Sequence, residues 1–132
     1  MKIDKPLGKT CWIIPDGYIP VPTDYDTGNR SGYLSHECVC ILNTGLEDVK
    51  ITLSFYFENA EPVVVDNITV QAQRSNHLRI DQLTQQDQPI VPPGKPYSLI
   101  VQSTAPIVVQ MSRLDTTQDN MAFLSTMAFP ID

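Results

Sequence analysis

The chain has 132 residues, a formal net charge of −6 and 42% hydrophobic residues, and this length suits one domain with its own core. The negative charge and the lack of any basic run exclude non-specific nucleic-acid binding, because affinity for phosphate comes from Lys and Arg. No apolar run approaches the roughly 18 residues of a membrane span, and the N-terminal segment lacks the apolar core of a secretory signal. Three cysteines suit a reducing compartment. We therefore expect one cytoplasmic domain over residues 1–132, with short flexible termini and no membrane insertion.

Eleven prolines and six glycines interrupt the chain at short intervals, and no segment keeps a 3.6-residue apolar period, so the sequence predicts little helix. The first predicted strand is Lys9 to Ile14. A loop over residues 15–33 follows, and loops of this length usually carry function or are disordered. Residues 36–57 are predicted to form a hairpin. Its second arm, Val49 to Phe57, alternates apolar and polar residues, whereas its first arm, His36 to Asn43, is apolar on both faces.

The second half of the chain continues the pattern of short strands. We predict another hairpin, with a turn at Ser103-Thr104-Ala105 and arms Tyr97 to Gln102 and Pro106 to Leu114. The segment Asp81 to Gln86 is expected to form one short helical turn. The remaining predicted strands are Pro62 to Val70, Ser75 to Ile80 and Met121 to Ala128. About eight short strands separated by turn signals predict an all-β, single-domain, jelly-roll-like β-sandwich.

Charged and polar residues gather in three segments that otherwise have the composition of buried strands. A desolvated charge usually needs a partner, so these residues are candidates for one polar binding site. Arg113 is the strongest candidate ligand contact, because its planar guanidinium suits carboxylate, phosphate or vicinal-diol oxygens. The candidate ligand-binding residues are His36, Glu37, Arg74, His77, Arg79, Gln110, Arg113 and Asp115.

A purely structural interpretation stands beside this one. His36, Glu37, Arg113 and Asp115 also fit an ion-pair network at a sandwich edge or subunit interface, and His36 and Glu37 face opposite ways on one strand. Ser75, His77 and Arg79 share a face that is either simply solvated or a binding surface. Four aromatic residues are candidate ligand contacts: Trp12, which we expect in the core, and the loop residues Tyr18, Tyr25 and Tyr33.

Metal and enzyme chemistry find little support. His36, Cys38 and Cys40 share one strand face, but a spacing of about 6.5–7 Å per two residues keeps them from sharing one tetrahedral zinc. No nucleophile elbow, phosphate-binding loop, dinucleotide fingerprint or H-E-x-x-H motif is present. We expect no metal, no cofactor and no catalysis; the alternative is an unrecognised hydrolase or isomerase using His36 and Glu37 as acid and base.

Several separate blocks, spread from about Lys9 to Ala128, have the order and spacing of a known family. They are Thr10-Cys11-Trp12, Gly17-Tyr18-Ile19-Pro20, Ser35-His36-Glu37, Cys40-Ile41-Leu42-Asn43 with Gly45, Arg74, His77, Arg79, Gln102-Ser103, Pro106-Ile107-Val108-Val109-Gln110, Arg113-Leu114-Asp115, and Leu124-Ser125-Thr126 with Ala128. Together these blocks resemble the sensory rhodopsin transducer family of small soluble bacterial proteins. The resemblance implies a β-sandwich subunit in a cyclic homotetramer with a signalling or ligand-binding role.

The sequence therefore favours a non-enzymatic, homo-oligomeric protein that binds a small polar, sugar-like ligand through its polar residues. Two strands that are apolar on both faces favour burial by another subunit. The first alternative is a transducer that docks on the cytoplasmic face of a membrane receptor such as a sensory rhodopsin, with the acidic loop 15–33 as the docking element.

Overall fold

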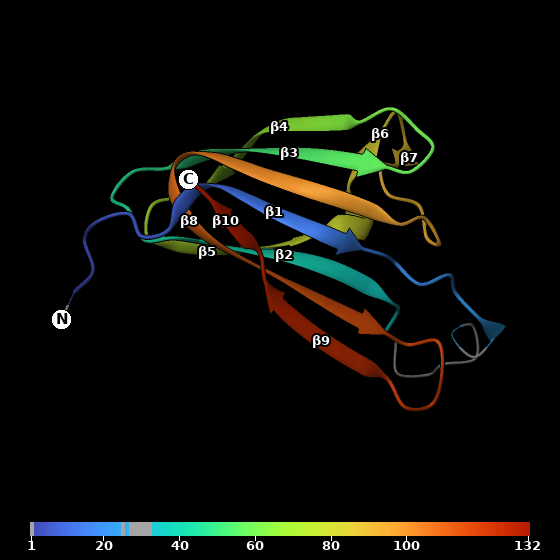
Figure 1. Ribbon diagram of the computed structural model, residues 1–132. Coiled ribbons are helices and arrows are strands. Elements are labelled where there is room, and N and C mark those ends of the chain that lie inside the picture. The colour runs from blue at the N-terminus through green and yellow to red at the C-terminus, as the bar shows by residue number, and fades with distance from the viewer. Residues whose placement is uncertain (1, 25, 27–32) are drawn as a thin grey trace.

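The computed structural model describes residues 2–24, 26 and 33–132, and the architecture of this part is almost entirely β (Figure 1). Within it, the strands and the single 3-10 helix follow in the order β1 (Lys9–Gly17), β2 (His36–Asn43), β3 (Val49–Phe57), β4 (Val63–Val70), β5 (Arg74–Arg79), η1 (Ile80–Gln82), β6 (Thr84–Gln85), β7 (Gln88–Pro89), β8 (Tyr97–Asp115), β9 (Ala122–Met127) and β10 (Phe129–Ile131). The predicted all-β sandwich class is confirmed.

The strands form two layers that share β8, which is 19 residues long. Its first part pairs with β1 and β3, and its second part pairs with β2 and β9, in each case antiparallel. The first layer therefore has the order β10-β1-β8-β3-β4, and the second layer has the order β5-β2-β8-β9. Figure 1 shows β8 crossing one layer, turning at one end of the sandwich and returning through the other.

Both predicted hairpins are wrong, although their strands exist. β2 pairs with β5 and β8, and β3 pairs with β4 and β8, so the two arms of the first predicted hairpin lie in different layers. The two arms of the second belong to one strand, β8, and do not pair with each other. In both cases the chain changes layer at a corner, as strands do in sandwiches whose sheets meet at their edges. The turn between β2 and β3 exists, but the predicted turn Ser103-Thr104-Ala105 is wrong, because these residues continue β8 as a strand. A local turn signal also does not specify which partner a strand takes.

The core lies between the layers and is built by alternation. Ile51, Leu53 and Phe55 of β3 are fully buried, as the alternating pattern predicted. Trp12 is also in the core, as expected, and its indole nitrogen donates to the carbonyl oxygens of Lys9 and Ile107 at 3.0 Å each. The outward residues of β2, by contrast, are only half-buried or exposed, so one protomer leaves them without full cover.

Three smaller elements differ from the prediction. The helical turn is a 3-10 helix that begins one residue earlier, at Ile80, whose side chain is buried. The residues after it form a small hairpin of β6 and β7, with Gln86 and Asp87 at positive φ in a two-residue turn. The short edge strand β10 was not predicted, because its sequence Phe129-Pro130-Ile131 offers little pattern and a proline.

Candidate functional site

Glu37 is the centre of a charged cluster between the layers. Its side chain lies on the inner face of β2 with no exposure to solvent. Oε1 accepts hydrogen bonds from the Tyr97 hydroxyl at 2.7 Å and the Tyr18 backbone N–H at 2.9 Å, and Oε2 accepts from Arg113 Nε at 2.9 Å. Arg113 also approaches Asp16, at 3.7 Å between Nη2 and Oδ1. Three donors therefore hold one buried carboxylate, which meets the usual requirement for a charge in a low-dielectric interior.

The path of β8 explains how these residues meet. Tyr97 begins β8 in the first layer, whereas Arg113 is near its end in the second layer and pairs directly with Glu37. Because β8 turns back at the far corner, its two ends lie on either side of Glu37. Gly17 of β1 is the register partner of Tyr97, and a Cβ there would lie 2.3 Å from Cζ of the tyrosine ring. The glycine therefore makes the space that the ring occupies.

Burial and hydrogen bonding act on the Glu37 carboxyl in opposite directions. Desolvation raises the pKa of Glu37, and the hydrogen bonds from Tyr97 and Arg113 lower it only in part, so the net shift is upward. Burial also raises the pKa of Tyr97, and the nearby Glu37 charge raises it further. Neither group faces solvent, so this cluster offers no accessible acid or base. We interpret it as a clamp that joins β1, β2 and both ends of β8.

A second polar cluster fixes the segment before β2. Asp26 is buried and accepts hydrogen bonds from the Thr116 hydroxyl and the Thr23 backbone N–H. The Thr116 backbone N–H in turn donates to Ser35 Oγ at 2.9 Å. These hydrogen bonds lower the pKa of Asp26, that from Thr116 contributing most. The cluster ties the described parts of the loop to the residues that follow β8.

The outer face of the second layer is the largest surface shared by the predicted site residues. Its register places His77, Cys40, Gln110 and Met127 in one row across all four strands. Alternation adds the apolar residues Leu42, Val108, Leu114 and Phe123 to the same face. Of its apolar residues, Leu42, Met127 and Phe123 are 43%, 52% and 69% exposed. We call this surface the four-strand face; it comprises Ser75, His77, Arg79, His36, Cys38, Cys40, Leu42, Val108, Gln110, Ser112, Leu114, Phe123, Ser125 and Met127.

The predicted ligand-binding residues divide between several places. His36, His77, Arg79 and Gln110 lie on the four-strand face, where Arg79 forms a two-point ion pair with Asp81 at 2.6 and 2.7 Å. In contrast, Glu37 and Arg113 point between the layers into the buried cluster. Asp115 accepts hydrogen bonds from Thr117, and Arg74 donates to its neighbour's carbonyl oxygen at the exposed start of β5.

The predicted pairing of His36 with Glu37 as acid and base finds no geometric support, since the two side chains lie on opposite faces of β2. His36 Nδ1 instead contacts the Leu34 carbonyl oxygen at 2.7 Å. Among the described residues, no group of three His, Cys, Asp or Glu side chains is arranged to hold a metal ion. The cysteines at 11, 38 and 40 carry free thiols.

The predicted aromatic contacts do not form one platform. Trp12 is buried, Tyr18 contributes its backbone N–H to the Glu37 cluster, and Tyr33 is 60% exposed. Tyr25 lies outside the described residues.

The sequence interpretation missed the roles of Tyr97 and Gly17. Two signals point to them: Tyr97 shares the inward parity of Leu99 and Val101, and a buried tyrosine hydroxyl needs a partner. A glycine inside a strand often marks a close approach, as Gly17 does here.

In the part of the chain that the structure describes, no helix has the length and apolar character of a membrane span. Comparison with curated proteins finds no match. The crystal structure of Thermotoga maritima 1070 is 37% identical, with a TM-score of 0.80 over 94% of this chain and 96% of that one. The Anabaena sensory rhodopsin transducer structure is 38% identical, with a TM-score of 0.67 over 80% of this chain and 88% of that one. Residues 7–130 match the family described as Anabaena sensory rhodopsin transducer. The resemblance seen in the sequence is thereby confirmed, and the chain belongs to the sensory rhodopsin transducer family.

Proposed function

We propose that this protein is a non-enzymatic cytoplasmic signalling protein that acts by binding a protein partner through its four-strand face. The observation that carries the proposal is the exposure of Leu42, Phe123 and Met127 together on that face. Leu42 and Met127 lie in adjacent rows of the register, and Phe123 lies two rows beyond Met127 on the same face. Isolated exposed apolar residues are ordinary, but several on one sheet face among polar neighbours favour a protein–protein interface. His36, His77 and Gln110 supply the polar neighbours here.

The buried cluster supports an interaction function over catalysis. Glu37, the one fully buried carboxylate of the predicted site, has its oxygens occupied by three protein donors. A catalytic acid or base must reach its substrate, and this carboxylate is shielded from solvent. The clamp instead holds the two layers, and so the four-strand face, in a fixed geometry.

We further infer that the protein assembles as a homotetramer. A cyclic tetramer needs two different complementary patches on each subunit, and the first layer carries exposed apolar residues at both of its edges, on β10 and on β4. On the first layer, one row crosses all five strands in register: Phe129, Ile13, Ile100, Ser54 and Val64. Phe129 is 63% and Val64 is 56% exposed in the single protomer. Assembly through the first layer leaves the four-strand face for a partner.

The partner that fits best is the cytoplasmic face of a membrane receptor of the sensory rhodopsin kind. Two properties support this proposal: membership of a family described as a sensory rhodopsin transducer, and the net charge of −6. Cytoplasmic loops of membrane proteins are rich in Lys and Arg, and a negative protein is attracted to them. The predicted loop 15–33 begins later than expected, because β1 continues to Gly17, and the exposed Asp16 is therefore an acidic residue of the strand end beside Arg113.

A second candidate function is the binding of a small polar, sugar-like ligand. A hollow of about 230 Å³ lies on the four-strand face, lined in part by Ser75, His77 and Gln110. Of the predicted polar set, His77 and Gln110 line this hollow, whereas Arg79 is engaged by Asp81 and Arg113 by Glu37.

The test measures binding of the purified protein to a sensory rhodopsin in lipid nanodiscs by surface plasmon resonance, with light scattering to give the mass of the assembly. His77→Ala and Phe123→Ser should weaken binding about tenfold, and Leu46→Ser is the control, because Leu46 is exposed in the turn between β2 and β3 and belongs to neither proposed surface. Equal binding by all variants contradicts the proposed face, and a wild type that never binds contradicts the receptor. A monomer across the micromolar range contradicts the tetramer.

The second candidate function is tested by a thermal-shift series of the wild type and Gln110→Ala with sugars.

A further inference from the structure

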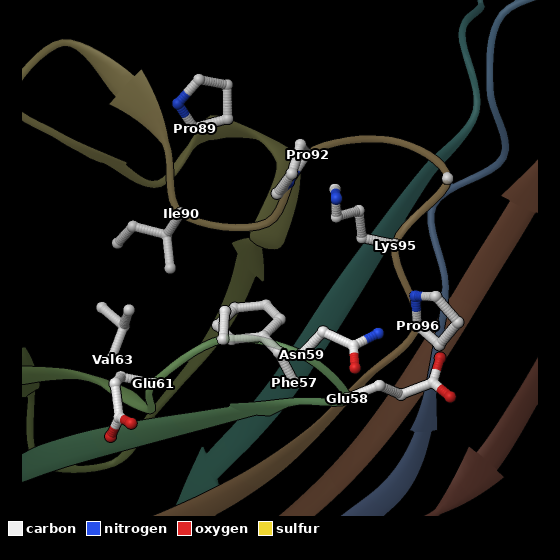
Figure 2. Close-up of a pocket in the computed structure, with 12 residues that line it drawn as sticks. Phe57, Glu58, Asn59, Glu61, Val63, Pro89, Ile90, Pro92, Lys95 and Pro96 are labelled. Atoms are coloured by element: carbon white, nitrogen blue, oxygen red, sulfur yellow. The ribbon is translucent and has the colours of Figure 1, made fainter.

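A pocket of about 460 Å³ lies at the end of the sandwich where β3 passes into β4 (Figure 2). Its two sides are the β3–β4 turn and the segment 89–96, and none of its lining residues belongs to the four-strand face or the Glu37 cluster. A volume of this size is within the range of sites for small organic ligands. Any function of the pocket is therefore additional to the protein-binding surface proposed above.

The interior of the pocket is apolar. Phe57 ends the inward row of β3, and its ring lies beside Val63 and Ile90 at one side of the pocket (Figure 2). All three side chains also pack into or against the hydrophobic core, and these contacts fix their positions. An apolar body of ligand size would be sheltered from water against these three residues.

The opposite wall is held rigid before any ligand arrives. Segment 89–96 contains four prolines, at positions 89, 92, 93 and 96, which restrict its backbone. Ile90 and Val91 are buried, and the Ile90 N–H donates to the Leu83 carbonyl oxygen at 3.0 Å. Gly94, at a φ of +81°, donates its N–H to the Ile19 carbonyl oxygen at 2.8 Å. Such preorganisation reduces the entropy lost on binding.

The polar groups of the pocket are unengaged. The side chains of Lys95, Asn59 and Glu58 make no hydrogen bond or ion pair with any other described residue. This contrasts with Glu37 and Arg113, which are paired. In Figure 2 Lys95 comes from the proline-rich segment, whereas Asn59 and Glu58 come from the β3–β4 turn, with Glu58 at the end beside Pro96. The pocket thus presents one cation, one amide and two carboxylates next to an apolar interior, and the second carboxylate, Glu61, lies beside Val63 at the apolar side (Figure 2).

We propose that this pocket binds a free α-amino acid with a large apolar side chain. Lys95 pairs with the carboxylate of the ligand, and Glu58 pairs with its ammonium group. The Asn59 side chain can donate an N–H to the carboxylate or accept from the ammonium group through its carbonyl oxygen. The apolar side chain packs against Phe57 and Ile90. Because such a ligand has no net charge, the protein's charge of −6 does not repel it as it would a simple carboxylic acid.

The test is a titration of the ¹⁵N-labelled full chain with L-leucine and L-phenylalanine, followed by amide chemical shifts. We expect saturable shifts confined to residues 57–63 and 89–96. N-acetyl-L-leucine lacks the ammonium group and L-leucinamide lacks the carboxylate, so each should bind about tenfold or more weakly. If either singly charged compound binds as tightly as L-leucine, recognition of both charges is overturned. Shifts elsewhere, or none that saturate, overturn the pocket.

Matched variants locate the charges. Lys95→Met and Glu58→Gln should each weaken binding of L-leucine about tenfold, because each removes one ion pair. Lys5→Met and Glu47→Gln make the same chemical changes at the opposite end of the sandwich, where β3 begins, and should leave binding unchanged (Figure 1). Losses that are equal in the pocket and control variants overturn the proposal, and the receptor-binding test does not depend on either result.

Discussion

The hydroxyl group of Tyr97 donates a hydrogen bond of 2.7 Å to Glu37 Oε1, across the space between the two layers. Tyr97 comes from the first layer and Glu37 from the second, so this bond, together with the core, holds the layers in register. Both groups are buried, and water cannot replace either partner.

Removal of this hydroxyl should destabilise the fold without disturbing its shape. We expect Tyr97→Phe to lower the free energy of unfolding by roughly 1.5–3 kcal/mol, the range for hydrogen bonds to charged groups. Urea unfolding measures the change, with Tyr56→Phe as the control, since Tyr56 is exposed on the outer face of β3. Equal midpoints for the two variants would show that the bond contributes nothing.

The raised pKa of Glu37 predicts a pH dependence of stability with a definite sign. Burial favours the protonated carboxyl in the folded state, so the stabilisation that comes from this proton is complete below the unfolded value of about 4.5. It is lost as pH rises through the higher folded pKa. The difference in unfolding free energy between the wild type and Glu37→Gln should therefore shrink as pH rises from 4.5. Denaturant titrations at several pH values check this, and a difference that grows with pH is the contrary result.

Gly17 and Tyr97 should be energetically coupled. An alanine Cβ at position 17 would lie 2.3 Å from the tyrosine Cζ, which forces the ring away from Glu37. We expect Gly17→Ala to cost roughly 1–3 kcal/mol, as overpacking does. In a double-mutant cycle the loss of the Tyr97 hydroxyl should then cost less in the Gly17→Ala background. Additive losses would mean that the glycine does not position the ring.

The wall of the amino-acid pocket depends on Gly94. Its φ of +81° disfavours any other residue, and a Cβ there would lie 2.6 Å from Val21 Cγ2. Gly94→Ala should destabilise the protein by about 1–2 kcal/mol through the backbone strain alone, and by more through the clash. Adding Val21→Ala to Gly94→Ala should recover the stability lost through the clash but not the stability lost through backbone strain. Thermal unfolding of the single and double variants measures both parts. Full restoration would contradict a backbone origin.

The sequence predicted the strands well because alternation is local. The parity of β3 correctly placed Ile51, Leu53 and Phe55 inside, and the parity of β2 separated His36 from Glu37. The same rule placed Ser75, His77 and Arg79 on one face. Each of these conclusions follows from the side-chain period of a single strand and needs no knowledge of its neighbours.

The partners of the charged residues were not predictable in this way. Arg113 was interpreted either as a ligand contact or as a member of an ion-pair network with His36, Glu37 and Asp115, and the structure pairs it with Glu37 of the adjacent strand, while His36 and Asp115 have other partners. Tyr97 and Gly17 escaped notice because their importance arises only when the ends of β1 and β8 meet. The pocket beside Phe57 likewise joins two segments that are about thirty residues apart in the chain.

The sequence by itself determined the all-β class, the strand faces and the family, since alternation and motif spacing are properties of the linear chain. Only the tertiary structure decided that β2 and β3 lie in different layers and that β8 turns a corner to enclose Glu37. The physical reason is that backbone hydrogen bonding between strands is alike for every sequence. The choice of partner therefore depends on how all the apolar faces are buried together.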